Sequence, residues 1–322
     1  MPQTLFEKPV PIARYRFSAT VQQPLQLPDY AGSLLRGQFG AALRQVACMT
    51  RQPTCAGCPL LQTCPYSRIF DAPAPPRGEH ALRDFSQVPN PYVMEPPEPG
   101  ARTLAAGASL HFGMVLIGHA TEQLALVVFA LQRALAQGLT RQRIPAVLTQ
   151  VQWLDAQGVA HTIWTNDRPA LADHPATLSI PAAPVGAEHI TLQIHAPLRL
   201  QQQGGPLGVD QLTPRALIAA LARRTALLLE LQARQSGWGE AARLATHLGG
   251  TLDDTRALHW FDWTRYSSRQ HQEMTLGGVL GHWTLHGHAQ TVAALWPWLW
   301  LGQWLHVGKN ATMGMGGYTL VA

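Results

Sequence analysis

A glycine-rich run near the C-terminus, His306 to Tyr318, places the strongest constraint on the fold. It contains four glycines in ten residues and separates a tryptophan-rich helical pattern from a short apolar strand. Glycine adopts positive φ easily and lets another group approach the main chain closely. The run lacks the spacing of a dinucleotide-binding motif or a P-loop, and it opens a strand rather than a helix. Two interpretations remain: a tight helix-to-strand connection, or a concavity of N–H groups that binds phosphate beside Lys309.

The charge of the chain favours an anionic partner. The 322 residues carry a formal net charge of +5, and 22 of the 24 basic side chains are arginine. Arginine suits bidentate contacts with phosphate and stacking on bases. No acidic residue follows Glu273, so the segment with the glycine run has no negative charge. No stretch is long and apolar enough for a membrane span, and the N-terminus lacks the apolar core of a signal peptide. We therefore expect a cytoplasmic protein that does not associate with membranes.

The cysteines indicate a metal centre. All four of them, Cys48, Cys55, Cys58 and Cys64, lie within 17 residues. Disulfides are rare in cytosolic proteins, so metal ligation is the better interpretation. The intervals of six, two and five residues match the cluster loop of endonuclease III-type DNA glycosylases and favour a [4Fe–4S] cluster. Zinc is the alternative, although a four-cysteine zinc site usually has a second C-x₂-C pair. Because four thiolates fill every ligand position, we expect a structural centre; four reduced cysteines without metal are the third interpretation. A DNA-repair enzyme is not favoured, because the helix-hairpin-helix surroundings of glycosylases are missing.

Hydrophobic periodicity predicts an α+β fold of two tandem ferredoxin-like (RRM-like) domains. In residues 188–322 the predicted order is β-α-β-β-α-β, which is the ferredoxin-like order. Residues 1–165 show a similar order, interrupted at 48–100 by the cysteine-rich metal loop and a proline-rich run that can conceal one more strand. Ser33 is the expected N-cap of the first helix. Residues 166–187 are proline-rich and are predicted to be a linker.

Three motifs follow one another in the second half of the chain. They are Asp262–Gln270 (DWTRYSSRQ), Met274–Gly278 (MTLGG) and His306–Gly316 (HVGKNATMGMG). Together they resemble the C-terminal domain of CRISPR-associated pre-crRNA processing endoribonucleases, which belong to the RAMP superfamily. The resemblance covers the second domain as a whole. Residues 13–46 are similar to the N-terminal domain of the family more loosely, and only some relatives carry a cysteine loop.

The resemblance implies a protein that binds the repeat of a CRISPR transcript and cuts it once without a catalytic metal. The ribose 2′-OH would attack the adjacent phosphate and leave a 2′,3′-cyclic phosphate and a 5′-OH. Such a reaction needs a base near the 2′-OH and a cation near the phosphate. The implied partners are CRISPR repeat RNA or crRNA and other subunits of a CRISPR effector complex. The alternative is a non-catalytic RNA-binding RAMP subunit.

Many members of this family place a catalytic histidine near the first helix, but no histidine precedes His80 here. We therefore take catalytic candidates from the first-helix neighbourhood, the predicted hairpin and the glycine run: Tyr30, Arg36, Tyr266, His306 and Lys309. Histidine is attractive because its side chain changes charge near neutral pH. The RNA-binding candidates are Arg44, Arg265, Arg269, His271, Gly308, Gly314 and Gly316. A His306 ring packed beneath the glycine run and a solvated hairpin are the competing interpretations.

Overall fold

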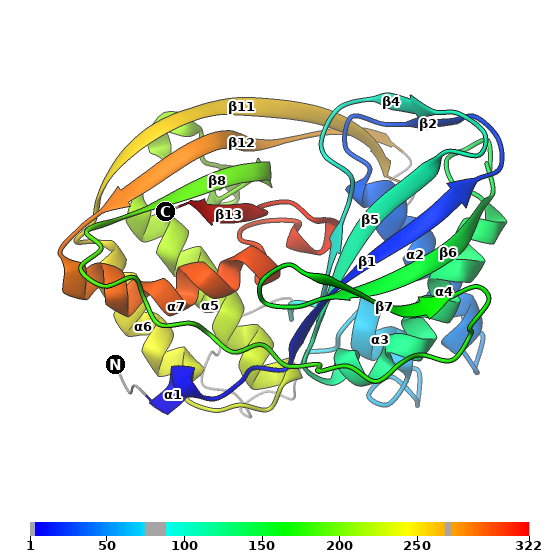
Figure 1. Ribbon diagram of the computed structural model, residues 1–322, viewed down its shortest axis with the longest axis horizontal. Helices are drawn as coiled ribbons and strands as arrows, with labels where there is room; N and C mark the ends of the chain where they lie inside the picture. Colours follow the sequence, from blue (N-terminus) through cyan, green and yellow to red (C-terminus); the bar gives the residue numbers. More distant parts are fainter. Residues whose placement is uncertain (1–3, 75–87, 268–271, 322) are drawn as a thin grey trace. The chain divides into compact units, whose positions relative to one another are not determined.

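A computed structural model describes residues 4–74, 88–267 and 272–321, with the side chains of 265–274 excluded (Figure 1). The chain divides into two compact units, which we describe separately. The N-terminal unit comprises Pro11–Leu178 and Leu231–Arg234. The C-terminal unit comprises Met1–Val10, Ser179–Glu230 and Gln235–Ala322.

The N-terminal unit contains a five-stranded antiparallel sheet with the order β3-β5-β1-β6-β7. Its strands are β1 (Ile12–Val21), β3 (Tyr92–Glu95), β5 (Ser109–Ile117), β6 (Ala146–Leu154) and β7 (Ala160–Thr165). Two further strands, β2 (Leu25–Leu27) and β4 (Arg102–Leu104), pair with each other. Apart from β7, the sheet follows the ferredoxin-like β-α-β-β-α-β order.

Helices supply the other half of this core. They are α2 (Gly32–Ala47), α3 (Pro65–Phe70) and α4 (Leu124–Gln137), which follows a 3₁₀ turn at Gly118–Gln123. Alternate residues of β1, such as Tyr15 and Phe17, are fully buried and belong to one cluster with Phe39 of α2 and Leu131 of α4. This alternation is what a strand with one covered face requires.

The C-terminal unit contains a four-stranded antiparallel sheet with the order β11-β12-β8-β13. Its strands are β8 (His189–Leu198), β11 (Asp253–Ser267), β12 (Gln272–His286) and β13 (Tyr318–Val321). The helices are α1 (Thr4–Glu7), α5 (Pro214–Gln232), α6 (Trp238–Gly249) and α7 (Ala289–Leu305). Short elements complete the unit: β9 (Gln201–Gln202), β10 (Gly205–Pro206), and 3₁₀ turns at Val209–Gln211 and Ala311–Met313. Trp238, Trp283 and Trp298 are completely buried.

The predicted tandem ferredoxin-like fold is confirmed, since both units carry the β-α-β-β-α-β order. The strand expected within the proline-rich run is β3. The prediction that Ser33 caps the first helix is wrong. The helix begins at Gly32, Ala31 occupies the N-cap position, and no side chain caps this end. Between β7 and β8, residues 166–188 form no helix or strand, and the two units divide after Leu178.

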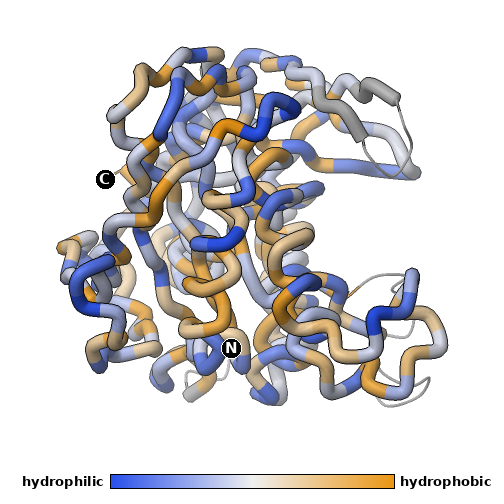
Figure 2. Tube along the Cα trace, turned by 90° about the vertical axis from the view of Figure 1, so that its right-hand side faces the viewer, coloured by the Kyte–Doolittle hydropathy of each residue, from blue (hydrophilic) through white to orange (hydrophobic). Residues whose placement is uncertain are grey.

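The described residues contain no helix that is both long enough and apolar enough to cross a membrane. Figure 2 shows the hydropathy of each residue along the trace, and apolar stretches alternate there with polar ones.

Two glycines of α2 give a matched test of this packing. A Cβ on Gly40 would overlap the ring of Phe70, whereas a Cβ on Gly37 would meet nothing within 4 Å. Phe70 is itself held between Tyr66 and Tyr92, with ring centroids 5.6 and 6.1 Å away, so it cannot move aside easily. We expect Gly40→Ala to lower the free energy of unfolding by about 1–3 kcal/mol, as overpacked cores do.

Gly37→Ala is the control for the same helix. It should raise the free energy of unfolding by up to about 1 kcal/mol, because alanine favours the helical conformation. Urea unfolding of both variants, followed by circular dichroism, measures the difference. Equal effects of the two substitutions would contradict the packing of Phe70 against α2.

Candidate active site

The glycine-rich run is packed against the end of β8. The N–H groups of Lys309 and Gly316 donate to the carbonyl oxygens of Arg199 and Pro197 at 2.8 and 2.9 Å. Gly308 and Gly316 have φ values of 89° and 73°, and a Cβ on either would overlap a backbone carbonyl. Close approach of two backbone segments therefore explains these two glycines.

Only part of the run faces solvent. Residues 313–318 are buried, whereas Lys309 is exposed and its neighbours Gly308, Asn310 and Thr312 are partly exposed. The N–H groups of Gly314 and Gly316, which we predicted to face RNA, donate to the carbonyls of Ala311 and Pro197. A phosphate that binds the main chain of this run would therefore meet residues 308–312, beside the Lys309 ammonium.

His306 lies inside the run. Its side chain is 2% exposed, and its Nδ1 lies 2.8 Å from the carbonyl oxygen of Gly314. Because a carbonyl only accepts hydrogen bonds, Nδ1 carries a hydrogen, and Nε2 is the acceptor in the neutral ring. The backbone of His306 has φ = 55° and ψ = 165°, a positive-φ conformation that ends α7. His306 thus ties α7 to the glycine-rich run.

A second histidine, His195 of β8, lies at the same place but is exposed. A Cβ on Gly317 would lie 2.7 Å from Cε1 of His306 and 3.0 Å from Cε1 of His195, so both rings reach one spot beside this glycine. The N–H group of His195 also donates to the Gly317 carbonyl at 3.2 Å. Our sequence reasoning missed His195, because only the pairing of β8 with β13 brings it to the glycine-rich run.

The open face of this sheet carries further histidines that the sequence scatters over several segments. They are His189, His259, His282 and His286, together with His195. The rings of His189 and His286 are 6.1 Å apart, and His286 Nε2 lies 3.0 Å from the hydroxyl of Thr255. In the sequence, the alternation of polar and apolar residues along β8 could have indicated that His189 and His195 lie on the same open face.

The candidates near the first helix lie in the N-terminal unit. Tyr30 is 1% exposed, and burial raises the pKa of its hydroxyl well above the usual 10, with Glu95 contributing in the same direction. The phenol is therefore protonated near neutral pH and is not a base. The guanidinium of Arg36 lies 4.3 Å from the centroid of the Phe70 ring. Arg44 donates from Nη2 to the carbonyl oxygens of Gln52 and Pro53 at 2.6 and 2.7 Å.

The predicted hairpin candidates lie at the far end of β11 and β12. Arg265 is paired with Met274, and Tyr266 with Glu273. The side chains of Arg265 and Tyr266 lie outside the described part of the structure. Arg269 and His271 lie outside the described residues.

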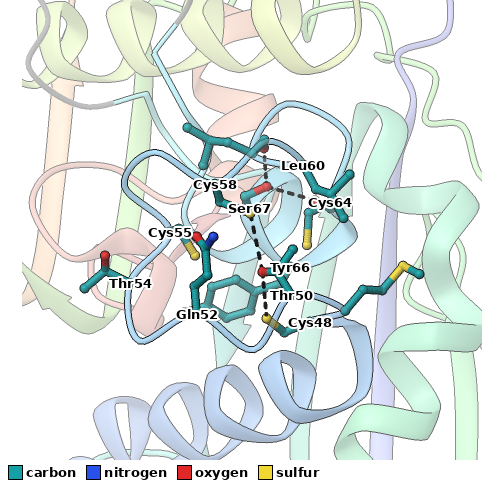
Figure 3. Close-up of a pocket in the computed structure, with 12 residues that line it drawn as sticks. Cys48, Thr50, Gln52, Thr54, Cys55, Cys58, Leu60, Cys64, Tyr66 and Ser67 are labelled. Atoms are coloured by element: carbon teal, nitrogen blue, oxygen red, sulfur yellow. Dashed lines mark hydrogen bonds between the residues drawn. The ribbon is translucent and has the colours of Figure 1, made fainter.

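The four cysteines, by contrast, are brought together in the N-terminal unit. All four line one pocket, drawn in Figure 3. The backbone N–H of Arg51 lowers the pKa of the Cys48 thiol, whereas burial raises that of Cys55. These residues form a second cluster of chemical interest, within a different unit from the glycine-rich run.

Two family models match the sequence. Residues 10–176 match the AF_1859_N family, described as an N-terminal domain, and residues 192–318 match the family described as CRISPR-associated endoribonuclease Cas6. The sequence similarity to Cas6 thus covers residues 192–318, the C-terminal part of the chain. This confirms the resemblance carried by the three sequence motifs. No curated protein matches the sequence significantly.

Solved structures of Cas6 proteins share the fold. The product complex of Cas6 (TTHB231) gives a TM-score of 0.59 at 16% identity, over 96% of this chain and 99% of that one. Thermus thermophilus Cas6 (TTHB231) gives 0.54 at 14%, over 98% and 99%. A partial Cas6-RT-Cas1–Cas2 complex gives 0.53 at 14%, over 98% of this chain and 47% of that one. At such identities the similarity establishes the fold.

The two histidines beside Gly317 should differ in their effect on stability. His306→Ala should lower the free energy of unfolding by about 1–3 kcal/mol, because it leaves the buried Gly314 carbonyl without this donor. His195→Ala should change it by less than about 0.5 kcal/mol, as exposed substitutions usually do. Urea unfolding followed by tryptophan fluorescence measures both. A stable His306→Ala variant would contradict the structural role of this ring.

Proposed function

We propose that the chain cuts the precursor CRISPR transcript within its repeat by metal-independent attack of a ribose 2′-OH. The products would be a 2′,3′-cyclic phosphate and a 5′-OH. The match of residues 192–318 to a family of CRISPR-associated endoribonucleases supports the reaction class. The observation that carries the proposal is the exposed edge of the glycine-rich run, where a cation and a titratable ring belong to the domain that matches the family.

Each residue of this edge has a distinct proposed role. Lys309 is exposed and would stabilise the charge that develops on the scissile phosphate. His195 would exchange a proton with the reacting oxygens, because its imidazole is exposed at this edge and its ring nitrogens can both donate and accept a hydrogen. The buried His306 would position the run through its bond to the Gly314 carbonyl rather than touch RNA. RNA would meet this site from the open face of the sheet, where exposed histidines can stack on bases.

We further propose CRISPR repeat RNA and other Cas proteins as partners. Solved Cas6 structures include product complexes and a substrate mimic complex, and one assembly is a Cas6-RT-Cas1–Cas2 complex. These structures support the proposal that this chain binds CRISPR RNA and assembles with other Cas proteins. The cytoplasmic location stays a prediction.

Cleavage of a labelled repeat RNA under single-turnover conditions in EDTA tests the proposed chemistry. The wild-type protein should cut the RNA and leave a 2′,3′-cyclic phosphate, detected by its resistance to phosphatase. His195→Ala should slow the cut by about 10²–10⁴, as loss of a general acid or base does. Lys309→Ala should slow it by about 10²–10³ while RNA affinity changes less.

The matched control is His247→Ala, an exposed histidine of α6. It should cleave at the wild-type rate. Full activity in both His195→Ala and Lys309→Ala would place the active site elsewhere. Tight binding without any cleavage by the wild type would instead favour the non-catalytic RAMP subunit.

Binding itself should depend steeply on salt. The net charge is +5, and nearly all basic side chains are arginine. We therefore expect several phosphates to be neutralised when RNA binds. Each neutralised phosphate of a single strand contributes about −0.7 to the slope of log K against log salt. Filter binding of repeat RNA from low to high salt should therefore give a strongly negative slope. An affinity that is independent of salt would contradict an arginine-led interface.

A further inference from the structure

The segment 48–64 is compact without a core of its own. It joins α2 to α3, contains no helix or strand, and has no buried residue. Six of its residues are partly shielded from solvent, and these are the four cysteines, Leu60 and Leu61. Holding such a loop in one conformation costs backbone entropy at every residue. With so little apolar burial to offset that cost, the loop needs a cross-link among its cysteines.

The four cysteines available for such a cross-link line one pocket. Figure 3 shows Cys48, Cys55, Cys58 and Cys64 around one pocket. The cavity among them has a volume of about 20 Å³, about the room of one water molecule. The hydroxyl of Thr50 lies between two of the thiols, 3.9 Å from Cys48 Sγ and 3.5 Å from Cys58 Sγ.

The thiols do not yet converge as metal ligands do. Within the described residues, no three Cys, His, Asp or Glu side chains are placed to hold an ion as they stand. All four cysteines are free thiols, so no disulfide closes the loop. None of the four cysteines is buried, so core packing does not fix the positions of these side chains.

The surroundings place one positive charge and one tight turn at the cysteine loop. Arg44 is anchored by its bonds to the carbonyls of Gln52 and Pro53, which fixes its positive charge beside the cysteine loop. The carbonyl of Cys55 accepts a hydrogen bond from the N–H of Cys58 at 3.2 Å, and Gly57 between them has φ = 73°. This tight turn keeps Cys55 and Cys58 close together, with the C-x₂-C spacing of a zinc knuckle. Arg44, which we predicted to bind RNA, therefore has a defined structural role here.

We propose that Cys48, Cys55, Cys58 and Cys64 bind one structural metal centre that holds segment 48–64 on the N-terminal unit. The shared chemistry is coordination by four thiolates, and either zinc or a [4Fe–4S] cluster satisfies it. Because all four ligands come from the protein, the centre has no open position for substrate. Its contribution is to folding, since binding of the metal and ordering of the loop occur together.

The test uses the full chain, purified without oxygen and again after reconstitution of the reduced protein with zinc or with iron and sulfide. We expect either about one zinc per chain, or four iron and four acid-labile sulfide with a brown colour. In either case the four thiols should react with Ellman's reagent only after the metal is removed. Removal should also lower the thermal midpoint of unfolding.

Cys58→Ser and Thr54→Ala separate ligation from a general effect on the loop. Cys58→Ser should lose the metal, and if it is insoluble, Cys55→Ser expressed at low temperature provides the same measurement. Thr54→Ala, an exposed position beside Cys55, should keep the wild-type metal content. Four thiols that react at once in the native protein, or two disulfides, with no metal bound after reconstitution would overturn the proposal. Unaltered metal content in Cys58→Ser would do so as well.

Discussion

The C-terminal unit depends on the close approach of two backbone segments, the glycine-rich run and the end of β8. A side chain at Gly308 would overlap the carbonyl oxygen of Arg199 and force the two segments apart, and one at Gly316 would overlap the carbonyl of Val307 within the run. Once they are in contact, Lys309 is left at the surface, His306 is enclosed, and β13 pairs with β8. Main-chain packing therefore shapes the candidate site, and Lys309 lies at the exposed border of the packed run.

Much of the fold could be predicted because both units repeat one simple order with clear periodicity. Alternation in strands such as β1 and β8 and turn signals such as Gly138, which ends α4 at φ = 98°, were sufficient. Helix α2 shows the limit of predictions from local sequence. Ser33 looked like an N-cap, but the helix begins at Gly32, and its register is set by the burial of Leu35 and Phe39.

The site was harder to predict because its parts are distant in sequence. His306 was recognised from a motif, yet only the structure shows that it is enclosed and that His195 is its exposed neighbour. Tyr30 likewise has a suitable residue type, but burial in the core removes it as a base. The cysteines are the opposite case. Their short spacing already indicated one cluster, and the fold then placed all four around one pocket.

The proline-rich run also has a consequence for how molecules of this protein meet one another. β3 forms an edge of its sheet, and an edge strand offers unpaired main-chain groups to any neighbouring chain. Here Pro91 precedes the strand and Pro96 and Pro97 follow it, so the edge is only four residues long. Proline cannot donate to a ladder, and so short a template does not support extended pairing. The run thereby supplies a strand to its own sheet and protects that sheet from aggregation through this edge.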